Sequence, residues 1–206
     1  MIISHAYKYV FLRTRKTASG STALYLMQNL FEEGDITIRD LRPEYDHPAP
    51  TLYDDTTVHY TLKYVIDNDL VDLNEYKVYA TLRDPYERII SRAFYKDDVK
   101  DVFMAQQVLA KGYVDEVDRA NPQSAYIVHD GQVKANIFDY DNLETDLRKM
   151  IESYGKQEKY PLQRLKSDIR PKWATVQTVI TPMIKQKIDE AFADDVKLWN
   201  MYKDMR

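Results

Sequence analysis

The chain has 206 residues, of which 44% are hydrophobic and 12% aromatic, so it is long enough to bury a sizeable core. Its 29 basic and 33 acidic residues give a formal net charge of −4, which argues against nucleic-acid binding through a broad positive surface but allows a local basic pocket. The absence of cysteine excludes disulfides, thiolate metal sites and cysteine nucleophiles, and it is typical of a reducing compartment.

The first residues do not have the pattern of a secretory signal. His5 and Lys8 fall inside the stretch that would have to be apolar, and no run approaches the roughly 18 apolar residues of a membrane span. We therefore expect a single domain over residues 1–206 that is soluble and cytoplasmic, with no membrane span and no nucleic-acid partner. The oligomeric state stays open.

The first predicted elements are a strand, a loop and a helix. Residues 7–12 are β-branched and aromatic, as in a strand, and the polar, small-residue stretch 13–22 follows them. Apolar residues recur at helical spacing over 22–33. A turn-rich stretch with three prolines over 43–50 then leads to a helix predicted over 61–68.

The pattern of strand, loop and helix then repeats. Residues 76–82 predict a second strand, and the Arg-Asp-Pro that follows begins a helix with proline at an early position. Residues 97–120 are charged and have a helical pattern. Asp130-Gly131 is typical of a hairpin turn, and residues 135–139 predict a third strand.

Two further helices are predicted towards the C-terminus, over 142–154 and 182–193. Strands that alternate with helices predict an α/β fold of three layers, in which helices cover both faces of a central, mainly parallel sheet. Open α/β folds bind their ligands at the carboxyl edge of such a sheet. The loops that follow the strands are therefore the first places to look for function.

The loop after the first strand is the most informative segment. It reads Arg15-Lys16-Thr17-Ala18-Ser19-Gly20-Ser21-Thr22. Small residues let the backbone bend close to an anion, helix-start N–H groups point toward it, and hydroxyls and a lysine add charge-assisted bonds. The loop is not a Walker A motif, because its lysine precedes the hydroxyl residues. The alternative is a side-chain-capped helix after a polar turn, since Ser and Thr favour N-caps for structural reasons.

A second block, residues 82–95, reads LRDPYERIISRAFY. Arg83 comes at the predicted strand end, and Ser91 follows eight positions later on the next helix. A guanidinium group holds a phosphate dianion through paired bonds, and a serine two turns along supplies a hydroxyl from the same side. Taken alone, the block is also compatible with an Arg-Asp-Pro turn that carries surface charges.

Together the two blocks resemble the sulfotransferases that use 3′-phosphoadenosine 5′-phosphosulfate (PAPS). In that family a strand, a Lys-Thr loop with further hydroxyl residues, and a helix bind the phosphosulfate, and an arginine and a serine in the positions of Arg83 and Ser91 bind the 3′-phosphate. Residues 123–147 are similar to a segment of the carbohydrate-type branch, and residues 194–199 look like the family's terminal segment. The resemblance implies a P-loop NTPase-like fold and sulfuryl transfer to an acceptor hydroxyl, with a saccharide favoured as acceptor.

The resemblance also implies a set of residues that bind PAPS. Residues 161–173 lie where such enzymes place a basic loop that closes over the nucleotide, although a solvated run of charges is the alternative. The expected PAPS-binding residues are Arg15, Lys16, Thr17, Ala18, Ser19, Gly20, Ser21, Thr22, Arg83, Ser91, Lys166 and Arg170.

Sulfuryl transfer needs a base for the acceptor hydroxyl and a cation for the charge on the departing phosphate. Lys16 is the candidate cation. His59 lies close to where the histidine of this branch is found, and an imidazole can accept a proton near neutral pH. A packed or surface histidine is the alternative. The chemistry requires no metal, and the competing bases are Glu44, His47, Asp54 and Asp55.

One residue departs from the family pattern. Gly20 stands where many relatives carry a threonine whose hydroxyl contacts the 5′-phosphate, so Ser19, Ser21 or Thr22 would replace it, or affinity would be lower. Two other functions stay open: a P-loop-type kinase or nucleotide hydrolase, which the placement of the lysine disfavours, and a catalytically silent nucleotide- or glycan-binding module.

Overall fold

A computed structural model describes residues 1–37, 59–111, 122–165 and 168–206. Its internal contacts divide the chain into two compact units. The sheet unit comprises Met1–Leu82 and Ala125–Leu165, and the helical unit comprises Arg83–Ser124 and Lys166–Arg206. A single domain over residues 1–206 stays a prediction.

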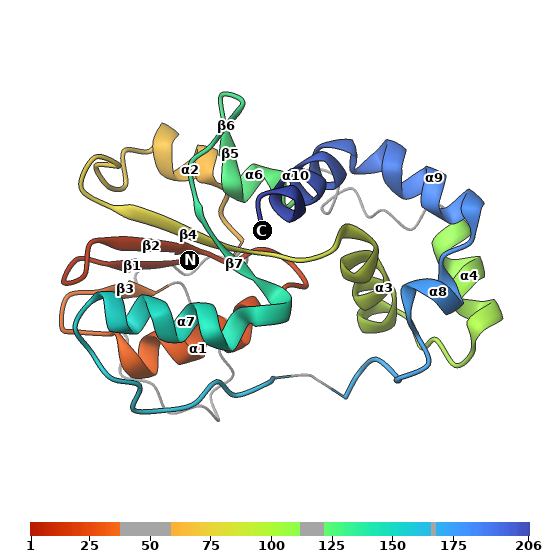
Figure 1. The fold of residues 1–206 in the computed structure, drawn as a ribbon, viewed down its shortest axis with the longest axis horizontal. Coiled ribbons are helices and arrows are strands. Elements are labelled where there is room, and N and C mark those ends of the chain that lie inside the picture. The colour runs from red at the N-terminus through yellow and green to blue at the C-terminus, as the bar shows by residue number, and fades with distance from the viewer. Residues whose placement is uncertain (38–58, 112–121, 166–167) are drawn as a thin grey trace. The chain divides into compact units, whose positions relative to one another are not determined.

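The sheet unit contains a five-stranded sheet with the strand order β3-β1-β2-β4-β7 (Figure 1). β2 runs parallel to β4, and β4 runs parallel to β7, whereas β1 pairs antiparallel with both β2 and β3. The four strands other than the two-residue β3 therefore form a mostly parallel sheet. The strands are β1 (Ile2–Ser4), β2 (Tyr9–Leu12), β3 (Ile36–Thr37), β4 (Lys77–Leu82) and β7 (Asn136–Asp139).

Helices α1 (Ser19–Asn29) and α7 (Leu143–Ser153) cover one face of this sheet (Figure 1). Because alternate strand residues point to opposite faces, Phe11, Tyr79 and Phe138 share the face that packs against these helices. The rings of Tyr79 and Phe138 stack with their centroids 5.2 Å apart. The short helix η1 (Tyr140–Asn142) leads from β7 into α7.

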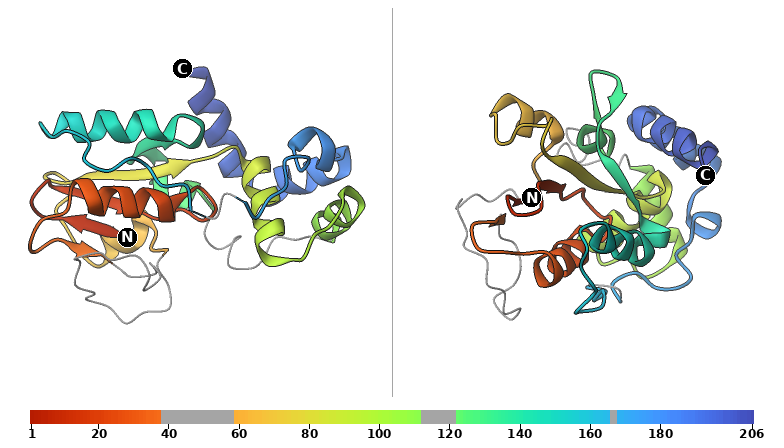
Figure 2. Two further views of the ribbon diagram at one scale, coloured as in Figure 1. Left: turned by 90° about the horizontal axis from the view of Figure 1, so that it is seen from below. Right: turned by 60° about the vertical axis from the view of Figure 1, so that its left-hand side comes forward.

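Helix α2 (Leu62–Asp67) lies on the other side of the sheet (Figure 2). Beside it, β5 (Val128–His129) and β6 (Gln132–Val133) form the predicted hairpin. Asp130 and Gly131 have φ values of 49° and 72°, as a two-residue hairpin turn requires. The expectation of a mixed α/β protein with a mostly parallel sheet flanked by helices is confirmed.

The described part of the helical unit is built from five helices and shorter connections. They are α3 (Pro85–Lys96), α4 (Val102–Ala110), α8 (Val176–Val179), α9 (Pro182–Ala191) and α10 (Ala193–Asp204). Ile90 and Phe94 of α3 pack against apolar side chains of α4, α8 and α9 to form its core. In the described ranges, no helix is long and apolar enough to cross a membrane.

Local interactions explain why α3 begins shortly after the end of β4. The Asp84 side chain accepts hydrogen bonds from the backbone N–H groups of Tyr86 and Glu87, and Pro85 occupies the first helical turn. Both features favour a helix start at this point. The Arg-Asp-Pro sequence therefore begins a helix as predicted. The short helix α6 (Ser124–Ile127) precedes β5.

Several predictions lie outside the described residues. They concern the turn-rich stretch 43–50, the second half of the helix predicted over 97–120, the competing bases Glu44, His47, Asp54 and Asp55, and Lys166 of the basic loop.

Candidate functional site

The loop between β2 and α1 contains two residues with left-handed backbone conformation. Lys16 has a φ of 59° and Ala18 a φ of 58°, a region that costs residues other than glycine about 1–2 kcal/mol. Between them, Thr17 is fully buried, and its hydroxyl donates to the carbonyl oxygen of Thr14 at 3.0 Å. The buried threonine therefore holds the turn from inside, with Lys16 on the partly exposed side.

Helix α1 begins directly after this loop, and no described side chain caps its N-terminus. The N-cap residue is Ala18, which has no polar side chain. The first N–H groups of a helix have no partner within the helix and carry partial positive charge. An anion placed at this helix start would therefore be stabilised, and a side-chain cap does not explain the small polar residues of the loop.

Three loop hydroxyls form hydrogen bonds inside the sheet unit. Thr22 donates to the carbonyl oxygen of Ala18 at 3.2 Å, and Ser21 accepts from the N–H of Leu165 at 2.9 Å. The hydroxyl of Thr17 is occupied as described above. These three hydroxyls therefore maintain the shape of the loop.

His59 lies beside the same loop. Its Nδ1 is 2.6 Å from the carbonyl oxygen of Arg13. A carbonyl oxygen can only accept, so Nδ1 carries the proton and Nε2 is the proton acceptor of the neutral ring. Burial lowers the pKa of His59 to about 3; the hydrogen bond opposes this shift, and the charges of Arg13 and Arg15 add to it. The ring is therefore uncharged at neutral pH.

We expect this partly buried histidine to destabilise the protein in acid. The folded-state pKa of about 3 lies below the ordinary value of 6.5, so in mild acid the unfolded chain binds a proton that the folded chain does not. The stability that the protein gains from keeping His59 neutral is complete above pH 6.5 and is lost progressively as the pH falls toward 3. At pH 5 the loss amounts to about 2 kcal/mol.

Chemical denaturation at pH 8 and pH 5 measures this loss, with His59→Asn as the variant that cannot titrate. The cost of His59→Asn should be about 2 kcal/mol smaller at pH 5 than at pH 8. An equal cost at the two pH values would contradict the assignment of a neutral ring at pH 5.

In the helical unit, Arg83 is the residue that directly follows Leu82 of β4, and it is 8% exposed. Its backbone N–H donates to Oε1 of Gln123, and its carbonyl oxygen accepts from Nε2 of Gln123, each at 2.9 Å. Ser91 lies on α3 and is partly exposed. The backbone of Arg83 is thus held on both sides by one amide.

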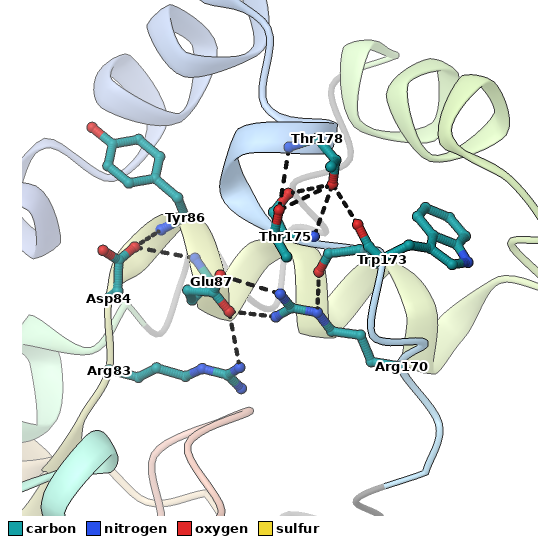
Figure 3. A network of polar contacts seen from close by, with 9 residues as sticks. Arg83, Asp84, Tyr86, Glu87, Arg170, Trp173, Thr175 and Thr178 are labelled. Carbon is teal, nitrogen blue, oxygen red and sulfur yellow. Dashed lines mark hydrogen bonds and ion pairs between the residues drawn. The ribbon is translucent and has the colours of Figure 1, made fainter.

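Glu87 joins the side chains of Arg83 and Arg170 (Figure 3). Arg170 contacts the carboxylate through Nη1 at 2.5 Å and Nη2 at 3.1 Å, and Nη2 of Arg83 is 3.4 Å from Oε2. Burial would raise the pKa of Glu87, but the hydrogen bond and charge of Arg170 and the charge of Arg83 outweigh it and lower the pKa. Glu87 thus holds the guanidinium groups of both arginines.

The segment that carries Arg170 is fixed by its own hydrogen bonds (Figure 3). Nε of Arg170 donates to the carbonyl oxygen of Ala174 at 2.5 Å. Thr175 and Thr178 form a reciprocal capping box at the start of α8, and the Thr178 hydroxyl also donates to the carbonyl oxygen of Trp173 at 2.6 Å. Arg170 therefore anchors its segment to Glu87 of α3, and its role as a phosphate ligand stays a prediction.

The predicted site residues fall into two groups. The loop 15–22 and His59 belong to the sheet unit, where the structure brings them together, and Arg83, Ser91 and Arg170 belong to the helical unit. Sequence reasoning missed Glu87 and Gln123. The spacing of four residues between Arg83 and Glu87 was a usable signal, whereas nothing local connects Gln123 with Arg83, 40 residues away.

No family model matches the chain, and comparison with curated proteins and with solved structures gives no match. In the part of the chain that the structure describes, no group of three or more His, Asp or Glu side chains is placed to hold a metal ion.

Proposed function

We propose that this protein is a sulfotransferase that moves a sulfuryl group from PAPS to an acceptor hydroxyl, with a saccharide as the favoured class of acceptor. One observation carries the proposal: the two segments that resemble the PAPS-binding motifs directly follow β2 and β4, which are neighbouring parallel strands. The carboxyl ends of neighbouring parallel strands are where open α/β folds bind their ligands.

Each group of residues has a role in this proposal. The loop 15–22 and the start of α1 would bind the 5′-phosphosulfate through N–H groups and Lys16. Arg83 and Ser91 would bind the 3′-phosphate. The start of α1, which no described side chain caps, supports the binding of an anion.

The proposed transfer makes one bond to sulfur and breaks another. A bond forms between the acceptor oxygen and sulfur, the bond between sulfur and the 5′-phosphate oxygen breaks, and the hydroxyl proton passes to Nε2 of His59. Lys16 and the N–H groups of the loop stabilise the negative charge that develops on the departing phosphate. With a pKa of about 3, His59 is a weak base in the ligand-free protein. A bound anion nearby would raise that pKa, because it favours the charged imidazolium.

Calorimetric titration with 3′-phosphoadenosine 5′-phosphate (PAP) tests the proposal. We expect PAP to bind more tightly than AMP or ATP, and Arg83→Ala to weaken PAP binding about 10- to 100-fold, because it removes charge-assisted hydrogen bonds. AMP binding should not change in this variant. Lys197→Ala removes an equal charge from an exposed position of α10 and serves as the control. Absent binding, or equal binding of ATP and PAP, would overturn the proposal.

A catalytically silent module that binds the same nucleotide is the second candidate. It is favoured by the low pKa of His59 and by Gly20. A Cβ atom at Gly20 would lie 3.8 Å from Nη2 of Arg13 and 4.0 Å from Cδ1 of Leu165, which are ordinary contacts. Packing therefore does not explain the glycine. Selective binding of PAP, without sulfation of any member of a panel of saccharides when PAPS is supplied, would support this candidate.

A further inference from the structure

We infer that Gln123 is a positioning residue for Arg83, an inference that rests on the proposed role of Arg83 in binding the 3′-phosphate. The Gln123 side chain is fully buried, and both ends of its amide bond the backbone of Arg83, at 2.9 Å each. The amide thus makes the pair of hydrogen bonds that a neighbouring strand residue would make.

The position of Arg83 in the chain explains why such a partner is needed. β4 ends at Leu82, and α3 begins at Pro85, so Arg83 belongs to neither element. Neither a strand ladder nor a helix therefore supplies its backbone hydrogen bonds in the regular way. A buried backbone group that loses its partner costs about 1–3 kcal/mol. Gln123 supplies both bonds at the residue that is proposed to bind the ligand.

Gln123 is itself held by a buried ion pair in the helical unit. Its backbone N–H donates to Oδ2 of Asp195 at 2.9 Å, and the N–H of Ser124 donates to Oδ1 at 2.8 Å. The same Asp195 carboxylate pairs with Arg88 of α3 at 3.2 Å, and both side chains are at most 1% exposed. A continuous series of hydrogen bonds therefore runs from α10 through Gln123 to Arg83.

This arrangement is expected to act on binding through Arg83. A guanidinium group whose backbone is already fixed loses less freedom when it binds a phosphate, and a displacement of about 1 Å is enough to weaken such a contact. Loss of the Gln123 amide should therefore reduce affinity for the 3′-phosphate although the arginine is present. The part of the nucleotide that Arg83 does not contact should bind as before.

Titration of Gln123→Ala with PAP and with AMP tests the inference. We expect PAP affinity to fall about tenfold and AMP affinity to stay unchanged, so that the ratio between them falls tenfold. In an Arg83→Ala background the Gln123 substitution should have no further effect on PAP binding, because the two residues act through one contact. Gln107→Ala, at an exposed glutamine of α4, is the control.

Two further measurements keep the test decisive. Gln123→Glu preserves the size of the side chain but removes the N–H group that donates to the Arg83 carbonyl oxygen. This variant should show the same loss of selectivity for PAP over AMP, and it replaces Gln123→Ala in the test if that variant does not fold. Hydrogen exchange at the Arg83 amide should accelerate in either variant. Wild-type protein that fails to distinguish PAP from AMP would overturn the proposed function and the inference with it. If the wild-type protein prefers PAP to AMP and the folded Gln123 variants keep this preference, the inference about Gln123 is wrong and the proposed function stands.

Discussion

Replacement of Asp195 by alanine is expected to lower the free energy of unfolding by about 3–5 kcal/mol. Asp195 and Arg88 are both buried, and Nη2 of Arg88 lies 3.2 Å from the carboxylate. The substitution leaves the guanidinium group in a low-dielectric interior without its counter-charge. It also removes the acceptor for the N–H groups of Gln123 and Ser124. Both losses destabilise the folded state in the same direction.

Urea denaturation followed by circular dichroism measures the effect of Asp195→Ala. Asp194→Ala is a matched control, because it removes an equal charge from the same first turn of α10 at an exposed position. Its cost should be at most about 1 kcal/mol. Similar costs for the two variants would show that the buried pair contributes little.

A double variant, Arg88→Met with Asp195→Ala, separates the two causes of this loss. We expect it to recover part of the stability, since the unpaired charge is gone. The recovery should be incomplete, because the N–H groups of Gln123 and Ser124 still lack their acceptor. Full recovery would assign the whole cost to the charge.

Lys16→Ala is expected to lower turnover about 100- to 1,000-fold, the range seen when one group that stabilises transition-state charge is removed. In the proposed reaction, negative charge on the departing phosphate increases as the bond to sulfur breaks. The lysine should therefore matter more for turnover than for binding of PAP. The formation of PAP from PAPS, with a panel of saccharide acceptors, measures this effect, and calorimetry with PAP measures ground-state binding.

Lys8→Ala is the matched control for this variant. Lys8 lies in the same unit and also has left-handed backbone conformation, with a φ of 52°, but it contacts Glu75 and Tyr76 outside the loop. Lys8→Ala therefore removes one positive charge and places alanine at a residue with positive φ, as Lys16→Ala does. Turnover should be unchanged in this variant. A loss as large as that of Lys16→Ala would show that neither effect is specific to the loop.

The elements with strong local patterns were predicted correctly. β2, β4 and β7 have compact runs of β-branched and aromatic residues, and α7 and α9 have clear apolar stripes. Helix α1 begins three residues earlier than predicted, at Ser19. Its first turn consists of small residues that resemble loop, and several of them are buried by other parts of the sheet unit.

The missed elements depend on contacts that a local pattern does not contain. β1 and β3 are three and two residues long, and each is defined by its antiparallel pairing. The helix predicted over 182–193 ends at Ala191, because Phe192, with a φ of −128°, interrupts it, and α10 was not predicted. Short strands and a single break in a helical region are decided by tertiary packing.

The surroundings of the candidate site could not be predicted from its motifs. The loop and Arg83 were candidates from the sequence, whereas the pKa of His59 depends on its burial in the fold and on its contact with Arg13, 46 residues away. The same holds for Glu87, whose carboxylate joins Arg83 to Arg170, 83 residues along the chain. Long-range electrostatic partners of this kind are set by the fold.

The left-handed backbone at Lys16 and Ala18 has a consequence for the thermodynamics of binding. Neither residue is glycine, so each narrows the range of conformations open to the loop in the unfolded chain. The folded loop, held by Thr17, has already lost most of its remaining freedom. An anion that binds there should therefore show a small conformational-entropy penalty, and its heat of binding should reflect new contacts and released water rather than the ordering of a segment.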